Sequence, residues 1–135
     1  MSVKMTTAIL ASILAACVLA IVAAFQVLLA LAMPFGNAAW GGAHRVLPPH
    51  LRLASAISVA PLVLAAWIVL ARTGVVTSPW KPATVSAVTW VGFAILVLST
   101  VGNSASKSRI ERIIMAPVAF VCSVCFLVVA LSDHS

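Results

Sequence analysis

Charged residues are scarce in this chain of 135 residues. Eight residues are Lys or Arg, two are Asp or Glu, and 64% of the sequence is hydrophobic. In a soluble domain about a quarter of the residues are charged. Ten charged side chains cannot form the polar shell that a soluble core of this size needs. The scarcity excludes a water-soluble globular domain and indicates an integral membrane protein.

The basic residues are too scattered to form a nucleic-acid-binding surface. The net charge is +6, but the eight basic side chains fall in short connectors and make no stripe or basic arm. Such residues orient a membrane protein and attract anionic lipid headgroups. We therefore expect lipid, and no nucleic acid, as the partner of these charges.

Four apolar segments are long enough to cross a bilayer, which needs about 20 apolar residues. They cover residues 7–33, 51–71, 83–103 and 113–131. Pro61 inside the second segment predicts a kink there, and Pro117 falls in the first turns of the fourth, where a missing amide proton costs little. The sequence predicts an all-α fold, a single domain of four transmembrane helices with antiparallel neighbours.

The distribution of basic residues predicts the orientation. Five of them flank the first and third connectors: Arg45, Arg52, Lys107, Arg109 and Arg112. Three lie with the termini and the second connector: Lys4, Arg72 and Lys81. The positive-inside rule then favours cytoplasmic first and third connectors, with both termini outside. Trp67, Trp80 and Trp90 fall toward the second connector, as an interfacial aromatic belt would.

The two halves of the chain share an order of landmarks. A span ends in Gly36-Asn37, a basic connector follows, and Ala60-Pro61 lies in the next span; Gly102-Asn103 and Ala116-Pro117 repeat this order. Two repeated helical hairpins would place the two GN-containing connectors on one face of the membrane. Chance recurrence of such short pairs is the competing explanation.

The first connector, "NAAWGGAHRVLPPHLR", is the most polar stretch. His44 and His50 have no nearby Cys, Asp or Glu to complete a metal site. One interpretation is structural: Gly41-Gly42 makes a tight turn and the arginines meet lipid phosphates. The other is a ligand site formed by Trp40, His44 and Arg45.

The third connector carries Glu111, one of the two acids; the other, Asp133, lies in the terminal tail. Lys107 and Glu111 are spaced for an i,i+4 ion pair, and the repeat would bring Glu111 near Arg45 and Arg52. A solvated charge cluster at headgroup level is the alternative. No span interior contains a charged residue, which argues against a proton-coupled transporter acting as a monomer.

The "CSVC" motif, Cys122 to Cys125, raises a redox alternative. Four spans with a CxxC on a late helix resemble the membrane thiol oxidoreductases of the vitamin K epoxide reductase type, which implies quinone-linked disulfide chemistry. Those enzymes also use a cysteine pair in an exposed loop, whereas the connectors here contain no cysteine and Cys17 lies inside the first span. Apolar packing therefore explains the cysteines better.

Hydroxyl side chains within the spans raise a further alternative. Ser86, Thr89 and Thr100 lie close to one stripe of the third span, where such residues usually hold helices together. The same residues would line the path of a small oligomeric transporter or channel. That function predicts liposome flux that fails when Thr89 is made bulky.

The runs "PFGNAAWGGAHRVLPPHLRLAS" and "SRIERIIMAP" resemble a pattern in small bacterial four-span membrane proteins with no assigned activity. The resemblance implies a multi-pass protein of the bacterial cytoplasmic (inner) membrane and transfers no functional residue. We expect a non-enzymatic accessory subunit or small binding module, without cofactor or metal, that forms a homo-oligomer or meets a membrane-protein partner. The expected ligand or partner surface consists of Trp40, His44, Arg45, Arg52, Arg109, Glu111 and Arg112.

Overall fold

The computed structural model describes residues 2–132 and is helical, without a strand in that range. Four long helices follow one another: α1 (Val3–Ala30), α2 (Pro49–Arg72), α3 (Pro82–Ser104) and α4 (Ala116–Leu131). The first connector contains two 3₁₀ turns, η1 (Gly36–Ala38) and η2 (Trp40–Gly42), and a π-helical turn, η3 (Glu111–Met115), leads into α4. The predicted all-α class is therefore confirmed. Asp133 lies outside the described residues.

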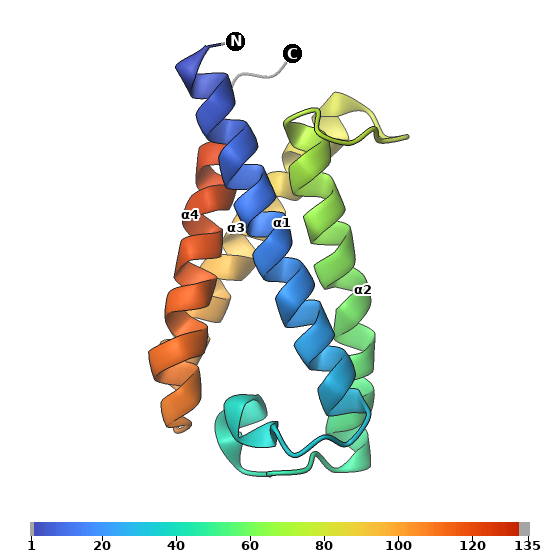
Figure 1. Cartoon of the computed structure of the whole chain (residues 1–135), viewed down its shortest axis with the longest axis vertical. Helices are drawn as coiled ribbons and strands as arrows, with labels where there is room; N and C mark the ends of the chain where they lie inside the picture. Colours follow the sequence, from blue (N-terminus) through green and yellow to red (C-terminus); the bar gives the residue numbers. More distant parts are fainter. Residues whose placement is uncertain (1, 133–135) are drawn as a thin grey trace.

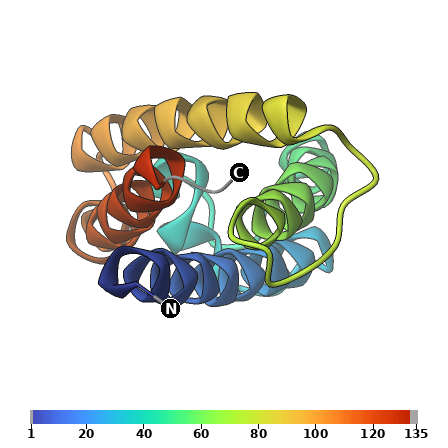
Figure 2. The ribbon, with the colours of Figure 1, turned by 90° about the horizontal axis from the view of Figure 1, so that it is seen from above.

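The four helices form an up-and-down bundle (Figure 1). Seen from above, α1 and α3 lie on opposite sides, with α2 and α4 between them (Figure 2). α1 packs on both α2 and α4, and α3 packs mainly on α4. α1 is inclined: it begins beside α4 and ends beside α2 (Figure 1). The bundle therefore widens toward the end where the first and third connectors lie.

The helix bounds follow from local sequence. α2 and α3 start at Pro49 and Pro82, since proline favours the first helical turn, where its missing amide proton is not needed. α2 continues through Pro61 without a break. Four helical segments are long and apolar enough to cross a membrane, and they overlap the four expected spans: Val3–Ala30, Pro49–Arg72, Pro82–Ser104 and Glu111–Leu131.

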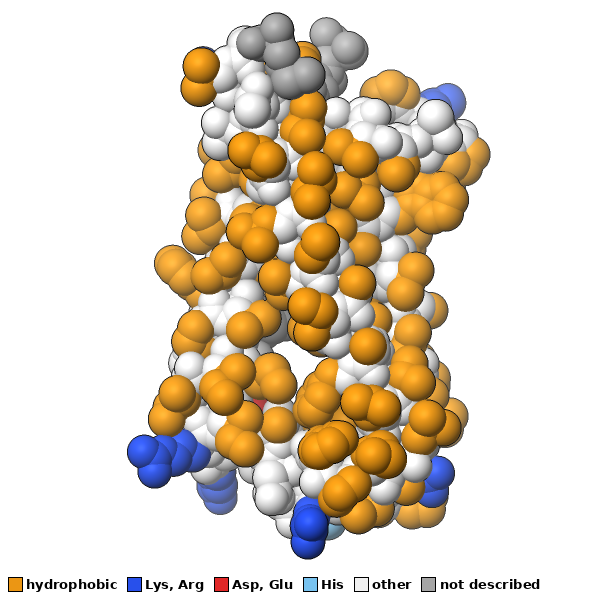
Figure 3. Space-filling model, in the orientation of Figure 1, with side chains coloured by type: hydrophobic (Ala, Val, Ile, Leu, Met, Phe, Trp, Pro, Cys, Tyr) orange, Lys and Arg blue, Asp and Glu red, His pale blue; other side chains and the backbone are white. Residues whose placement is uncertain are grey.

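A small apolar core occupies the half of the bundle near the second connector. Its largest fully buried side chain, Phe126, is 1% exposed and packs with Leu19, Val69 and Val129. The Phe126 ring lies directly against the backbone of α3 at Gly92, where an added Cβ would stand 2.7 Å from Phe126 Cε2. Much of the remaining apolar surface of all four helices faces outward (Figure 3). Helices that are apolar on every face are typical of a membrane-embedded bundle.

A buried hydroxyl pair joins α1 to the end of α2. Ser12 Oγ and Thr73 Oγ1 are 2.8 Å apart, and both residues are buried. The carbonyls of Ile9 and Leu70 lie within hydrogen-bonding distance of the Ser12 and Thr73 hydroxyls respectively. Because each hydroxyl has one proton, one of the two donates to its partner while the other donates to a carbonyl.

We expect the Ser12–Thr73 pair to contribute little to stability. A double-mutant cycle with Ser12→Ala and Thr73→Val should give a coupling energy of about 0.6 kcal/mol, the average for such bonds within membranes. Unfolding in mixed detergent micelles measures it. A coupling energy near zero would show that the two hydroxyls prefer their own helices.

The proposed repeat is not visible in the connectors. Gly36-Asn37 lies in η1, beyond the end of α1, whereas Gly102-Asn103 lies within the last turn of α3. The first connector covers residues 31–48 and the third only 105–110. The two hairpins do point the same way (Figure 1), and a common origin of the two halves stays a prediction.

Candidate functional site

The first connector folds back across the wide end of the bundle. The Gly36 amide donates to the Arg45 carbonyl at 2.8 Å, which closes the segment into a loop. Ala39 and Leu47 anchor the loop, because both are buried against Leu29 near the end of α1. The first connector is therefore packed against the bundle and is not an extended loop.

Three successive residues in this loop have positive φ angles: Trp40 (52°), Gly41 (81°) and Gly42 (75°). Glycine adopts this region freely, but tryptophan does so at a cost of order 1–3 kcal/mol. The surroundings hold the strained residue in place, since Trp40 Nε1 donates to Ser55 Oγ at 2.9 Å. The turn directs the Gly41 amide toward α4.

The loop is bonded to the third connector. Ser108 Oγ donates to the Asn37 carbonyl at 2.5 Å, and the Gly41 amide donates to Glu111 Oε1 at 3.3 Å. The sequence separations are about seventy residues, so these bonds join the two halves of the chain. The two connectors expected to share one surface do converge.

Glu111 stands at the centre of this junction. It is only 6% exposed, and its other carboxylate oxygen accepts a hydrogen bond from the Ser106 hydroxyl. The Glu111 amide donates to Ser108 Oγ at 3.3 Å. Glu111 opens the π-helical turn η3, in which the Ala116 amide bonds to the Glu111 carbonyl. Single π-helical turns are rare and often occur at functional sites.

Above this junction lies a cavity of about 690 Å³. All four helices and the first connector contribute to its walls. The space-filling view shows a hollow in the molecular surface at this level, with an acidic side chain at its edge (Figure 3). Glu111 is the acid among the described residues. The volume is within the range of about 300–1,000 Å³ typical of small-molecule sites.

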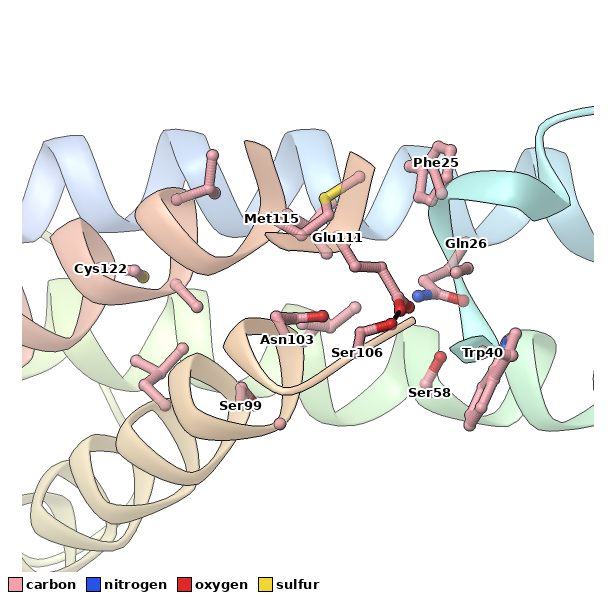
Figure 4. Close-up of a pocket in the computed structure, with 18 of the residues that line it drawn as sticks. Phe25, Gln26, Trp40, Ser58, Ser99, Asn103, Ser106, Glu111, Met115 and Cys122 are labelled. Atoms are coloured by element: carbon pink, nitrogen blue, oxygen red, sulfur yellow. Dashed lines mark hydrogen bonds between the residues drawn. The ribbon is translucent and has the colours of Figure 1, made fainter. Parts of the chain in front are cut away.

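The cavity is polar at one end and apolar at the other (Figure 4). Its polar end, toward the connectors, is lined by Gln26, Trp40, Ser58, Asn103, Ser106, Lys107 and Glu111. Its apolar end, toward the core, is lined by Leu19, Leu62, Leu96, Val118 and Cys122. Gln26 Oε1 is buried and has no hydrogen-bond partner within residues 2–132.

Only some of the expected site residues lie at the cavity. Trp40 and Glu111 line it. Arg112 supports it from outside, because its guanidinium donates to the Ser106 carbonyl at 2.8 Å. The others lie outside the lining: His44, Arg45 and Arg109 are exposed, and Arg52 Nε donates to the Ala30 carbonyl at 3.0 Å.

The expected ion pairs of Glu111 are not formed among the described residues. Its carboxylate bonds to a hydroxyl and a backbone amide, and neither Lys107 nor Arg45 nor Arg52 is its partner. The reason is geometric: η3 turns Glu111 inward, and Lys107 precedes that turn in the connector and so does not share one helix with it. The acid therefore faces the cavity without an ion pair among the described residues.

Sequence reasoning missed several polar residues that the fold brings to the cavity. Gln26, Ser58 and Asn103 come from three different helices, and Ser106 comes from the third connector. A signal existed for Gln26, which is the only glutamine in the chain and falls in an apolar span. No local pattern marked the others.

The cysteines and Thr89 lie apart from the polar end of the cavity. Cys122 and Cys125 are buried and free, and Cys17 is exposed on the outer side of α1. Thr89 is fully buried, donates to the Val85 carbonyl at 2.8 Å and lies outside the cavity lining. The described residues contain no group of three His, Cys, Asp or Glu side chains close enough to hold a metal ion.

The fold and the cavity define a class: an all-helical protein with four helices long and apolar enough to cross a membrane, and one amphipathic cavity described between them. No protein-family model, curated protein or solved structure matches this chain. The function is therefore argued from the geometry alone.

Proposed function

We propose that the chain is a multi-pass protein of the bacterial cytoplasmic membrane, with both termini outside, that acts as a non-enzymatic small binding module. The outward-facing apolar surface of the four helices supports insertion. Three partly exposed tryptophans, Trp67, Trp80 and Trp90, mark the headgroup region at the second-connector end.

The opposite end carries the basic surface, which we define as Arg45, Lys107, Arg109 and Arg112. All four side chains are exposed, and basic side chains gather at this end of the molecule (Figure 3). Their proposed partners are anionic lipid headgroups, which attract basic residues by about 1 kcal/mol each. This end would face the cytoplasm.

The observation that carries the binding role is the bonded junction at Glu111. Hydrogen bonds from two connectors converge on one buried carboxylate at the polar end of a cavity. Burying a carboxylate is costly unless it is compensated. The bonds from Gly41 and Ser106 hold the two connectors together and use two acceptor sites of the carboxylate. The acceptor sites that remain are available to a ligand in the cavity.

A binding site accounts for the cavity better than a channel through one copy. The apolar core around Phe126, Val69 and Val129 fills the bundle beyond the cavity, toward the second connector. A continuous path across the bilayer would have to pass through those buried side chains. An accessory subunit in a larger membrane assembly is compatible with the same site.

We expect the basic surface to retain anionic lipid. The purified protein should carry phosphatidylglycerol in preference to phosphatidylethanolamine in native mass spectrometry. The double variant Arg45→Gln, Arg109→Gln should weaken phosphatidylglycerol binding by about thirtyfold, because two contributions of about 1 kcal/mol are lost. Neither side chain donates a hydrogen bond that stabilises the loop.

The matched control removes two exposed charges from the other end of the bundle. Lys4→Gln with Lys81→Gln lowers the net charge equally, and both residues are exposed. Phosphatidylglycerol binding should be unchanged in this variant. An equal loss in both double variants would contradict a lipid-binding surface at the connectors and leave only net charge as the cause.

A further inference from the structure

We propose that the cavity binds a lipophilic amine, with its ammonium group at Glu111 and its apolar body toward Cys122. This inference rests on the proposed binding function and adds the chemical class of the ligand. It follows from the hydrogen-bonding groups, the charge and the shape of the cavity, taken in turn.

The polar end of the cavity has unused acceptors. An ionised carboxylate has about four acceptor sites, and Glu111 uses two of them, for the Ser106 hydroxyl and the Gly41 amide. Gln26 Oε1 is buried and accepts from no group within residues 2–132. Gln26 and Glu111 approach one another across the cavity from α1 and η3, with the amide nitrogen of Gln26 turned toward the carboxylate (Figure 4). A ligand that fills the free acceptor sites of Glu111 must supply more than one N–H or O–H donor.

The charge of the cavity wall selects a cation. The Glu111 carboxylate is 6% exposed and has no cationic partner among the described residues. A buried charge is tolerated when it is paired. A ligand ammonium would provide the pair, whereas a ligand carboxylate or phosphate would be repelled. Lys107 also lines this end, but its side chain is exposed and forms no ion pair with Glu111 among the described residues.

The aromatic and apolar lining fits the remainder of such a ligand. Phe25 and Trp40 flank the polar end (Figure 4), and aromatic faces attract ammonium groups. Beyond them, Leu62, Leu96 and Val118 offer an apolar surface. The volume of about 690 Å³ accommodates a head group together with an alkyl or aryl body.

The way in lies on the side of the bundle. α1 and α4 diverge toward the connectors (Figure 1), and the hollow is open on that face of the molecule (Figure 3). The first connector covers the end of the bundle through its bonds to Ser108 and Glu111. A lipophilic amine dissolved in the bilayer would therefore enter between these two helices.

The test uses the full-length protein in nanodiscs of zwitterionic lipid and four probes with the same chain: octylamine, octyltrimethylammonium, octanol and octanoate. Calorimetric titration, corrected with empty nanodiscs, measures binding. Octylamine should bind tightest. Octyltrimethylammonium has the charge without N–H donors and should bind about tenfold more weakly, and octanol and octanoate weaker still.

Two variants locate the binding. Glu111→Gln keeps the size of the side chain and one acceptor oxygen for the Gly41 amide, and its NH2 group would donate to the Ser106 hydroxyl oxygen. It removes the charge, and should weaken octylamine binding by about tenfold or more. Gln26→Met removes the neighbouring amide at similar size without changing the charge, and should alter octylamine binding much less than Glu111→Gln does. Helical circular dichroism and phosphatidylglycerol retention should match the parent chain in both variants.

Three results would overturn the proposal: octanoate or octanol binding as tightly as octylamine, octylamine binding that is equal in Glu111→Gln and the parent, or no binding of any probe. The first leaves the proposed binding function intact and changes only the ligand class. Retention of phosphatidylglycerol at the connectors tests that function separately, so the two failures are distinguishable.

Discussion

Replacing Gly92 with leucine should lower the stability of the bundle by about 1–3 kcal/mol, the usual cost of overpacking a core. An added Cβ alone would stand 2.7 Å from Phe126 Cε2, and the Phe126 ring is 1% exposed. α3 and α4 would be pushed apart where they pack most closely. Unfolding in mixed micelles and the thermal midpoint measure the loss.

Gly102 in the same helix provides the matched control. An added Cβ there meets nothing within 4 Å. Gly102→Ala should be neutral or stabilising by up to about 1 kcal/mol, the gain in helix propensity, while Gly92→Ala should destabilise. Phe126→Leu should partly rescue Gly92→Ala if the ring is the obstacle. Equal effects at the two glycines would contradict the α3–α4 packing.

Replacing Gly42 with valine should release the first connector from the third connector and η3 while the helices remain folded. Gly42 has φ +75°, and an added Cβ would lie 2.8 Å from Ser108 Cβ and 2.9 Å from the Asn37 carbonyl oxygen. A β-branched residue is strained in this region and would also break the Ser108–Asn37 contact. In a variant whose only tryptophan is Trp40, the emission should shift to the red and hydrogen exchange of residues 36–45 should accelerate.

Gly74 in the second connector provides a control in which a substitution strains the backbone without a steric contact. Its φ is +79°, and an added Cβ meets nothing within 4 Å. Gly74→Val should therefore cost a similar amount of backbone strain and leave Trp40 emission and exchange in the first connector unchanged. Protection of residues 36–45 that persists in Gly42→Val would show that the connector does not depend on its bonds to Ser108 and Glu111.

The helices were predictable because their signal is local. An apolar run of about 20 residues needs no tertiary contact to be recognised, and turn formers such as Pro49, Pro82 and Gly74 mark the boundaries. Membrane orientation rests on the same kind of counting, through the basic residues of the connectors. The kink at Pro61 and the repeat of two hairpins remain predictions.

The candidate site was only partly predictable. Trp40 and Glu111 were distinctive as single residues, an aromatic in a glycine turn and an isolated acid. The partners of Glu111 were not, because an ion pair with Lys107 assumes that a regular helix continues through both residues. The π-helical turn η3 changes that geometry and aims the carboxylate at the Gly41 amide.

The sequence by itself determined that this chain builds apolar helices separated by basic connectors, since composition and hydropathy act within each segment. Only the tertiary structure decided that α1 is inclined, that the bundle widens at one end, and that Gln26, Ser106 and Glu111 meet there around a cavity. The physical reason is distance along the chain. These groups come from three separate elements, and packing and hydrogen bonds between remote residues, which no local pattern encodes, bring them together.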